Sequence, residues 1–87
     1  MTEFLTHCRV CGWDHGDYIW GASGDEASFE ICECCGTEFG YEDSTVESTR
    51  NKRREWIMQG LKWFKPKSMP NDWKFEDYKL FIPEKYR

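Results

Sequence analysis

Cys8-Arg9-Val10-Cys11-Gly12 and Cys32-Glu33-Cys34-Cys35-Gly36 are the stretches that decide the fold of this sequence. Each reads Cys-x-x-Cys-Gly, and residues 12–31 separate one cysteine pair from the other. This arrangement fits the C-x2-C-x15–20-C-x2-C spacing of four-thiolate zinc sites. Zinc prefers four ligands at the corners of a tetrahedron, and two cysteines in one tight turn can occupy neighbouring corners. The spacing therefore predicts one structural Zn²⁺ ion bound by Cys8, Cys11, Cys32 and Cys35.

The residues beside these cysteines refine the prediction. Gly12 and Gly36 can take a positive φ, which lets the backbone fold back under the metal. The fifth cysteine, Cys34, is left over, and the odd count together with the lack of a secretory segment argues against a disulfide framework. A reactive Cys34 would need a nearby base, and its neighbour Glu33 would disfavour a thiolate, so we expect a structural thiol.

Two histidines leave an alternative open. His7 and His15 flank the first cysteine pair, and either imidazole could replace one cysteine as a zinc ligand. The spacing favours the four-cysteine site, and the mixed site stays open as an alternative.

The length of the chain makes a metal important. A chain of 87 residues is expected to form one domain with a modest core, and structural zinc can contribute on the order of 10 kcal/mol to folding. We therefore expect the N-terminal half to unfold without metal. The sequence has no apolar run long enough to span a bilayer and no signal-peptide pattern at its start. With reduced cysteines, this predicts a cytoplasmic protein.

Charge divides the chain into two halves. Residues 1–43 carry ten acidic side chains and one basic side chain, whereas residues 44–87 carry six acidic and eleven basic ones. The formal charges are therefore −9 and +5, within a total of −4. A four-thiolate zinc site would add about two negative charges to the first half. An acidic first half is suited to a basic partner.

The sequence predicts a small α+β domain, residues 1–87, whose first part is a zinc ribbon over residues 1–43. Residues 4–7 are expected to form a short strand before the first cysteine pair, and residues 14–28 read as strand, turn, strand. Phe29, Glu30 and Ile31 alternate apolar and charged side chains, as in a half-buried strand, and the strand at 37–41 follows. The expected architecture is a set of antiparallel β-hairpins that carry two cysteine knuckles.

Residues 44–87 are predicted to form a helix and an irregular, aromatic-rich strap packed on the ribbon. Ser44 and Glu47 fit a capping box, and Gly60 is well placed to end a helix over residues 45–59. A second helical turn is possible over residues 71–79, with Asn71 or Asp72 as its cap. The chain has 15 aromatic residues, and we expect most of them to be buried.

Basic residues of this second half suggest an alternative function, nucleic-acid binding. Helical geometry places Arg50 and Arg54 on one face and Lys52 away from it, so no clean basic stripe forms. A solvated helix, or one whose arginines contact the acidic ribbon, is favoured over phosphate binding. The candidate basic residues are Arg50, Lys52, Arg53, Arg54, Lys62, Lys65 and Lys67.

Three segments match one known family pattern: Ser28-Phe29-Glu30-Ile31-Cys32-Glu33-Cys34-Cys35-Gly36-Thr37-Glu38-Phe39-Gly40-Tyr41-Glu42-Asp43, Arg54-Glu55-Trp56-Ile57 and Gly60-Leu61-Lys62-Trp63-Phe64. They resemble small bacterial cysteine-rich proteins of the CPCC type, and the resemblance covers about two thirds of the chain. This sequence departs from that pattern at Arg9 and Glu33, where the family usually has proline. The resemblance implies a zinc-ribbon-like fold, no established enzymatic activity and, for some such proteins, immunity against a secreted toxin.

The leading hypothesis is a non-enzymatic, zinc-stabilised protein-interaction module, in the form of an immunity protein that neutralises a basic bacterial toxin. An acidic, aromatic surface would steer onto such a partner. An enzyme would need an open zinc position, which four thiolates disfavour. The candidate partner-binding residues are Asp14, Asp17, Trp20, Asp25, Glu26, Glu38, Glu42 and Asp43.

Overall fold

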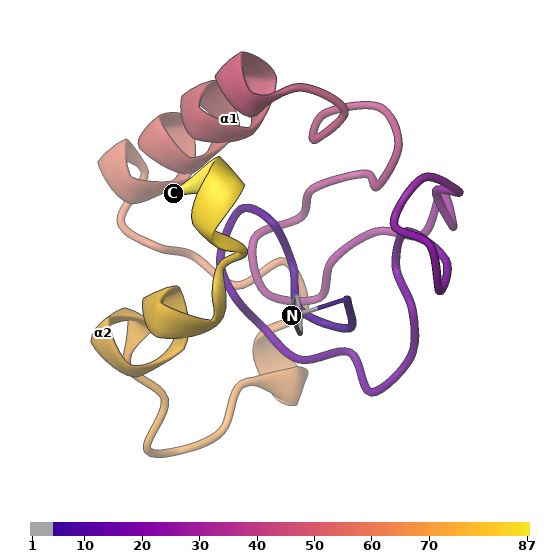
Figure 1. Ribbon diagram of the computed structural model, residues 1–87. Helices are drawn as coiled ribbons and strands as arrows, with labels where there is room; N and C mark the ends of the chain where they lie inside the picture. The colour runs from indigo at the N-terminus through magenta and orange to yellow at the C-terminus, as the bar shows by residue number, and fades with distance from the viewer. Residues whose placement is uncertain (1–4) are drawn as a thin grey trace.

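The structure, a computed structural model, describes residues 5–87 and consists of short helices joined by irregular segments (Figure 1). The α-helices are α1 (Val46–Met58) and α2 (Phe75–Tyr78). Three 3₁₀-helices are found in the second half of the chain: η1 (Pro66–Ser68), η2 (Lys79–Phe81) and η3 (Glu84–Tyr86). Within residues 5–87, no helix combines the length and the apolar character that a membrane crossing requires.

The predicted zinc ribbon of β-hairpins is wrong, because residues 5–87 contain no β-strand. Two isolated antiparallel bridges stand where hairpins were expected, one between His7 and Asp14 and one between Ile31 and Glu38. The strand predicted over residues 4–7 begins at Phe4, which lies outside the described residues, and its described part contributes only the bridge at His7. A single β-bridge can close each cysteine turn without a ladder of paired strands.

Turn chemistry stops these bridges from growing into strands. The Asp14 side chain accepts a hydrogen bond from the Gly16 amide at 2.8 Å, which turns the chain directly after the first bridge. Phe29 has φ +60°, in the left-handed region, so the alternating stretch 29–31 cannot be extended throughout. On the far side of the second bridge, Gly40 has φ +93° and the Tyr41 amide donates back to Glu38 O.

The cysteine turns, residues 8–12 (the first knuckle) and residues 32–36 (the second knuckle), are structural repeats of one another. Positions 24 residues apart make the same backbone hydrogen bonds, of 2.8–3.0 Å. In the first knuckle the bonds run from Cys8 N to Trp13 O, from Gly12 N to Cys8 O and from His15 N to Thr6 O. In the second knuckle the equivalent bonds run from Cys32 N to Thr37 O, from Gly36 N to Cys32 O and from Phe39 N to Glu30 O.

Helix α1 begins one residue later than the sequence suggested. Its N-cap is Thr45, which forms the capping box with Ser48, so the predicted pairing of Ser44 with Glu47 is wrong. Thr45 Oγ1 accepts from the Ser48 amide at 3.0 Å, and Ser48 Oγ accepts from the Thr45 amide at 3.2 Å. The helix ends at Met58, and Gly60 follows with φ +92°, as expected for a helix stop.

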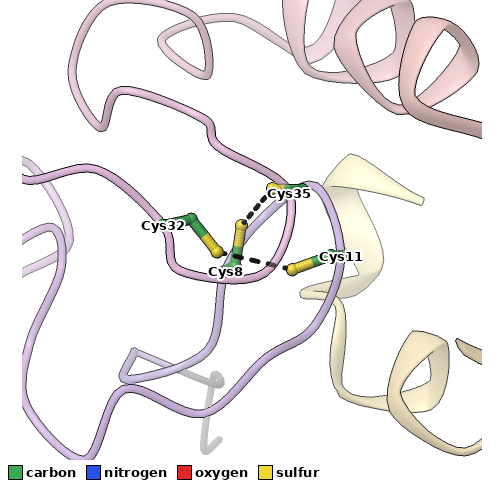
Figure 2. A group of neighbouring side chains, drawn as sticks. All are labelled: Cys8, Cys11, Cys32 and Cys35. Atoms are coloured by element: carbon green, nitrogen blue, oxygen red, sulfur yellow. Dashed lines mark hydrogen bonds between the residues drawn. The ribbon is translucent and has the colours of Figure 1, made fainter. Parts of the chain in front are cut away.

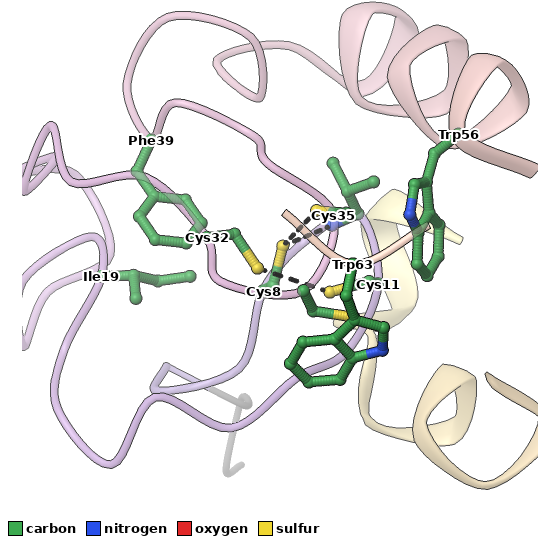
Figure 3. Close-up of a cluster of buried hydrophobic side chains, with 10 residues drawn as sticks. Cys8, Cys11, Ile19, Cys32, Cys35, Phe39, Trp56 and Trp63 are labelled. Atoms are coloured by element: carbon green, nitrogen blue, oxygen red, sulfur yellow. Dashed lines mark hydrogen bonds between the residues drawn. The ribbon is translucent and has the colours of Figure 1, made fainter. Parts of the chain in front are cut away.

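The C-terminal segment packs on the knuckles and on α1. Trp63 packs edge-on against Trp13 at 4.9 Å between ring centroids and against Trp73 at 5.4 Å. The α1 side chain Trp56 packs edge-on against Phe75 of α2 at 5.3 Å. Figure 3 shows Trp56 and Trp63 on one side of the cysteines and Phe39 on the other. The cysteines and these aromatic rings form one core.

The short helix α2 lacks the cap that the sequence suggested. Its N-cap is Lys74, which makes no side-chain capping bond, so the prediction of Asn71 or Asp72 as the cap is wrong. Helix α2 is held by its neighbours instead. A Cβ atom at Gly12 would lie 1.9 Å from the carbonyl oxygen of Tyr78, so the end of α2 rests directly on the first knuckle.

Candidate metal centre

The two knuckles bring Cys8, Cys11, Cys32 and Cys35 together, which are the cysteines selected by their spacing (Figure 2). Their sulfur atoms all lie within 4.8 Å of one another. Cys8 Sγ lies 3.6 Å from Cys35 Sγ, and Cys11 Sγ lies 3.6 Å from Cys32 Sγ. These two contacts are equivalent under the repeat of the knuckles, since each joins the first cysteine of one knuckle to the second cysteine of the other.

The spacing of the sulfur atoms fits a tetrahedral metal ion. An ion with metal–sulfur bonds of about 2.3 Å places its ligands about 3.8 Å apart at the corners of a regular tetrahedron. The observed contacts of 3.6 Å and the upper limit of 4.8 Å bracket this value, so only small side-chain shifts are required. Within residues 5–87, which include every cysteine, no disulfide forms. The four cysteines could therefore bind one metal ion.

Burial of the four cysteines affects whether their thiols can ionise. Burial raises the pKa of the Cys8, Cys11 and Cys32 thiols well above the usual value, because an isolated thiolate is poorly solvated there. Burial acts in the same direction on Cys35, but hydrogen bonds from Cys11, Cys32 and Cys8 outweigh it and lower the pKa of that thiol. Four thiolates can coexist at this site only around a positive ion, which is the chemistry of a thiolate metal centre.

Hydrogen bonds from the chain also reach the sulfur atoms. The Val10 amide donates to Cys8 Sγ at 3.3 Å, and Thr37 Oγ1 lies 3.0 Å from Cys35 Sγ. Thr37 is fully buried, so its hydroxyl is directed at the cluster rather than at solvent. Groups around the ligands orient them and tune the charge of a metal site.

The outer carbonyl groups of the two knuckles accept hydrogen bonds from different kinds of donor, a side chain in the first and backbone amides in the second. In the first knuckle, Arg53 of α1 donates through Nε to Val10 O at 2.7 Å and through Nη2 to Arg9 O at 2.8 Å. In the second, the Phe64 and Lys65 amides donate to Cys34 O and Glu33 O at 2.9 and 2.8 Å. The Arg53 guanidinium also donates to Tyr86 O at 2.6 Å and so ties η3 to the first knuckle.

Cys34 lies outside the four-sulfur group and is fully buried. It occupies the position in the second knuckle that Val10 occupies in the first, and Val10 is also fully buried. Both residues belong to the core cluster. The arrangement fits the expected structural thiol, because a small apolar side chain fills this position in the other knuckle.

The histidines are also outside the sulfur group. His7 stacks on Phe81 at 4.9 Å between ring centroids, and its Nε2 lies 3.9 Å from Asp14 Oδ2. His15 packs edge-on against Phe39 at 5.1 Å. Burial lowers the pKa of both imidazoles, although nearby acidic groups oppose the shift. Of the two ligand sets considered from the sequence, the geometry favours the one with four cysteines.

The candidate partner-binding residues divide into exposed and internal ones. Asp43 is fully buried: its carboxylate accepts from Trp20 Nε1 at 2.9 Å and from the Gly40 amide at 2.7 Å, and burial raises its pKa. Trp20 is half-buried beneath the Arg9 guanidinium, and Glu42 pairs with Lys52 at 3.4 Å. The exposed members are Asp14, Asp17, Asp25, Glu26 and Glu38.

Several candidate basic residues contact the chain itself. Besides Arg53 and Lys52, Arg50 donates through Nε to Arg87 O at 2.7 Å, and Arg54 donates to Asn51 Oδ1 at 2.8 Å. The remaining candidates, Lys62, Lys65 and Lys67, are exposed. The contacts of Arg53 and Lys52 agree with the expectation that basic side chains of the helix contact the acidic first half.

Sequence reasoning missed a groove beside the metal centre. It has a volume of about 820 Å³ and is lined by residues beside or within the two knuckles, among them Asp14, Glu30 and Glu33, together with Phe64 and Lys65 of the C-terminal half. Glu30 could have been noticed as the polar position of the alternating stretch 29–31, whereas Glu33 lies within the second knuckle. The approach of residues 64 and 65 to the second knuckle left no signal in the sequence.

Comparison with known proteins gives one distant likeness. The chain is similar to an uncharacterized protein of Bacillus subtilis (strain 168), YoaQ, with 26% identity over an alignment 96 positions long that covers 85% of this chain and 75% of the relative. No family model matches the chain, so the resemblance to CPCC-type proteins has no support from a family match. No solved structure matches it either. These comparisons bring no function to the chain, which leaves the site itself as the basis for one.

Proposed function

We propose that this chain is a non-enzymatic module that binds one structural Zn²⁺ ion and engages a protein partner through its acidic half. The burial of the four cysteines supports the structural role of the ion: Cys8, Cys11 and Cys32 are at most 1% exposed and Cys35 is 6% exposed. A catalytic zinc keeps one position for water or substrate. Four buried thiolates fill a tetrahedron, which supports a structural ion.

The ligand set favours zinc among the metals of the cell. Soft thiolates in a tetrahedral arrangement suit Zn²⁺ or an iron–sulfur centre. Paired Cys-x-x-Cys turns are the common donor arrangement of structural zinc sites. Purified protein should carry one Zn²⁺ per chain by mass spectrometry under non-denaturing conditions; iron with sulfide, or no bound metal after purification with zinc present, would refute the assignment.

The acidic half supports a basic protein as the partner. Asp17, Asp25 and Glu26 are exposed within residues 1–43, whose formal charge is −9 before any thiolate is counted. Such a surface attracts a basic partner over distances of about 8–10 Å at physiological salt and accelerates encounter. Together with the resemblance to CPCC-type proteins, this favours an immunity protein that neutralises a basic toxin domain.

A pull-down tests the proposal. The tagged chain is loaded with zinc, incubated with extract from its own source cells in the presence or absence of nuclease, and the retained proteins are identified by mass spectrometry. We expect one stoichiometric basic protein that remains after nuclease treatment. A preparation that retains only nucleic acid, or proteins lost with nuclease, would refute protein binding and favour the basic residues of α1 instead.

Charge-reversal variants sharpen this test. Asp25→Lys with Glu26→Lys should slow association with the retained protein about tenfold at 50 mM salt, because attraction between unlike charges is weakened. The matched control, Asp72→Lys with Glu76→Lys, reverses two exposed carboxylates in the basic half. Equal effects of the two pairs would show that net charge, rather than the acidic half, governs association.

A further inference from the structure

The groove beside the metal centre combines charge with exposed aromatic surface. Its carboxylates are Asp14, Asp17, Glu30 and Glu33, and its basic residue is Lys65. Three of its lining rings are largely accessible: Tyr18 is 50% exposed, Phe29 is 66% exposed and Phe64 is 53% exposed. A volume of about 820 Å³ lies within the range of ligand-binding pockets. The groove therefore offers anionic and aromatic contacts in one hollow.

The backbone around Phe29 presents its ring at the groove. Phe29 has φ +60°, which is an uncommon conformation for a bulky residue. A Cβ atom at Gly40 would lie 2.8 Å from Phe29 Cε1 and 2.5 Å from Ala27 Cβ, so the ring rests on glycine backbone that no larger residue could provide. The ring is thus supported from below while two thirds of its residue surface stays exposed.

The same molecule already shows how aromatic rings and a backbone can hold a guanidinium. The Arg9 guanidinium carbon lies 3.9 Å from the Trp20 ring centroid and 4.4 Å from the Tyr86 ring centroid. Its nitrogen atoms donate to Asp43 O and Gly24 O, each at 3.1 Å. Stacking on rings together with planar hydrogen bonding is the property that distinguishes arginine from lysine.

We propose that the groove binds an arginine side chain of the protein partner. The guanidinium would stack on the exposed faces of Phe29 and Tyr18 while Glu30, Glu33 or Asp14 accept its hydrogen bonds. This inference rests on the proposed protein-binding function and names the chemistry of its contact. The charge complementarity is direct, since four carboxylates and one ammonium line the groove.

The experiment uses the full zinc-loaded chain and a capped pentapeptide that contains two arginines. The controls are the same peptide with citrulline, an uncharged isostere of arginine, and the same peptide with lysine. Binding is followed by amide chemical shifts in a titration at about 50 mM salt. We expect the arginine peptide to shift amides that line the groove and to bind at least about fivefold more tightly than either control.

Variants locate the site. Glu30→Gln with Glu33→Gln should weaken the arginine peptide about fivefold, and Phe29→Gly, which is compatible with φ +60°, should weaken it about threefold. Lys65→Gln should tighten binding about twofold, because it removes the positive charge in the lining. The matched control, Glu47→Gln with Glu55→Gln, removes two exposed carboxylates of α1 and should leave binding unchanged.

Several outcomes would overturn the inference. Equal binding of the citrulline or lysine peptide would exclude guanidinium recognition, and equal weakening by the α1 control would indicate general attraction to acidic protein. A retained protein partner whose binding is unaffected by the Glu30→Gln and Glu33→Gln pair would overturn the groove assignment and leave the proposed function intact. Specific binding of the arginine peptide without any retained protein partner would overturn the proposed function and leave the assignment of the groove intact.

Discussion

The two knuckles repeat one set of backbone hydrogen bonds but depend on different surroundings. The first rests on the carbonyl of Tyr78 beneath Gly12 and is held from outside by the Arg53 side chain. The second is held by the amides of residues 64 and 65. A turn held by one distant side chain can be damaged by one substitution. A turn held by backbone amides is insensitive to most side-chain changes, so mutations should separate the two knuckles.

Removal of the metal should break both knuckles at once. Structural zinc can contribute on the order of 10 kcal/mol to folding, which is comparable to the whole stability of an ordinary domain. Chelation, or Cys11→Ser, should therefore abolish the cooperative thermal transition measured by circular dichroism. The control is Cys34→Val, which gives the second knuckle the residue of the first and should change the free energy of unfolding by less than about 1.5 kcal/mol. Equal loss in both variants would contradict the assignment of the ligands.

Alanine at the two knuckle glycines should have the next largest effect and should destabilise the first knuckle more than the second. Gly12 has φ +81° and Gly36 has φ +77°, so alanine costs about 1–2 kcal/mol at either position. At Gly12 the added Cβ would also lie 1.9 Å from Tyr78 O, whereas at Gly36 it would lie 3.2 Å from the ring of Phe64, an exposed side chain that can move. We expect a loss of about 3–4 kcal/mol for Gly12→Ala and about 1–2 kcal/mol for Gly36→Ala in chemical denaturation. Equal losses would mean that α2 does not press on the first knuckle.

Replacement of Arg53 should loosen the first knuckle alone. Arg53→Gln removes hydrogen bonds from a charged group to Val10 O, Arg9 O and Tyr86 O, and we expect a loss of about 2–3 kcal/mol. Hydrogen exchange should accelerate at the Gly12 amide, which donates within the first knuckle, and stay unchanged at the equivalent Gly36 amide. Arg54→Gln, at an exposed neighbour, is the control and should cost less than about 0.5 kcal/mol.

Local patterns in the sequence predicted the metal ligands and the end of α1. Cysteine spacing selected the four sulfur atoms that cluster, because the geometry of a metal site constrains cysteines three positions apart and the turn that holds them. Gly60 indicated the end of α1 for a similar reason, since few other residues adopt its φ of +92°. The strands could not be excluded in the same way, because the alternation at 29–31 looks identical whether or not Phe29 turns into the left-handed region.

Long-range contacts were beyond the sequence. Asp43 looked like a surface carboxylate, yet the Trp20 indole and the Gly40 amide compensate its burial. Arg53 belonged to a basic cluster that suggested phosphate binding, and its acceptors, Val10 O, Arg9 O and Tyr86 O, are 43, 44 and 33 residues away in the chain. Composition gives the number of charges but not their partners, so the division of residues into internal and exposed required the fold.

The smallest predicted effect concerns His15 and Phe39, which occupy equivalent positions in the two repeats and pack edge-on. The buried Nε2 atom of His15 has no hydrogen-bond partner among residues 5–87, and burial lowers its pKa below 6.5 although nearby acidic groups, the Cys35 thiol and the Glu33 carboxylate first among them, oppose the shift. The unfolded chain therefore binds more protons than the folded chain just below pH 6.5, and stability decreases as pH falls through this window.

His15→Phe makes the first repeat resemble the second and should flatten that part of the pH dependence of stability, measured by denaturation of zinc-saturated protein from pH 7.5 to 5.5. Both proteins keep a remaining slope, because the four cysteines must release protons to bind zinc and because the pKa of His7 is also lowered. Parallel curves for the native chain and His15→Phe would mean that His15 remains as well solvated in the folded protein as in the unfolded chain.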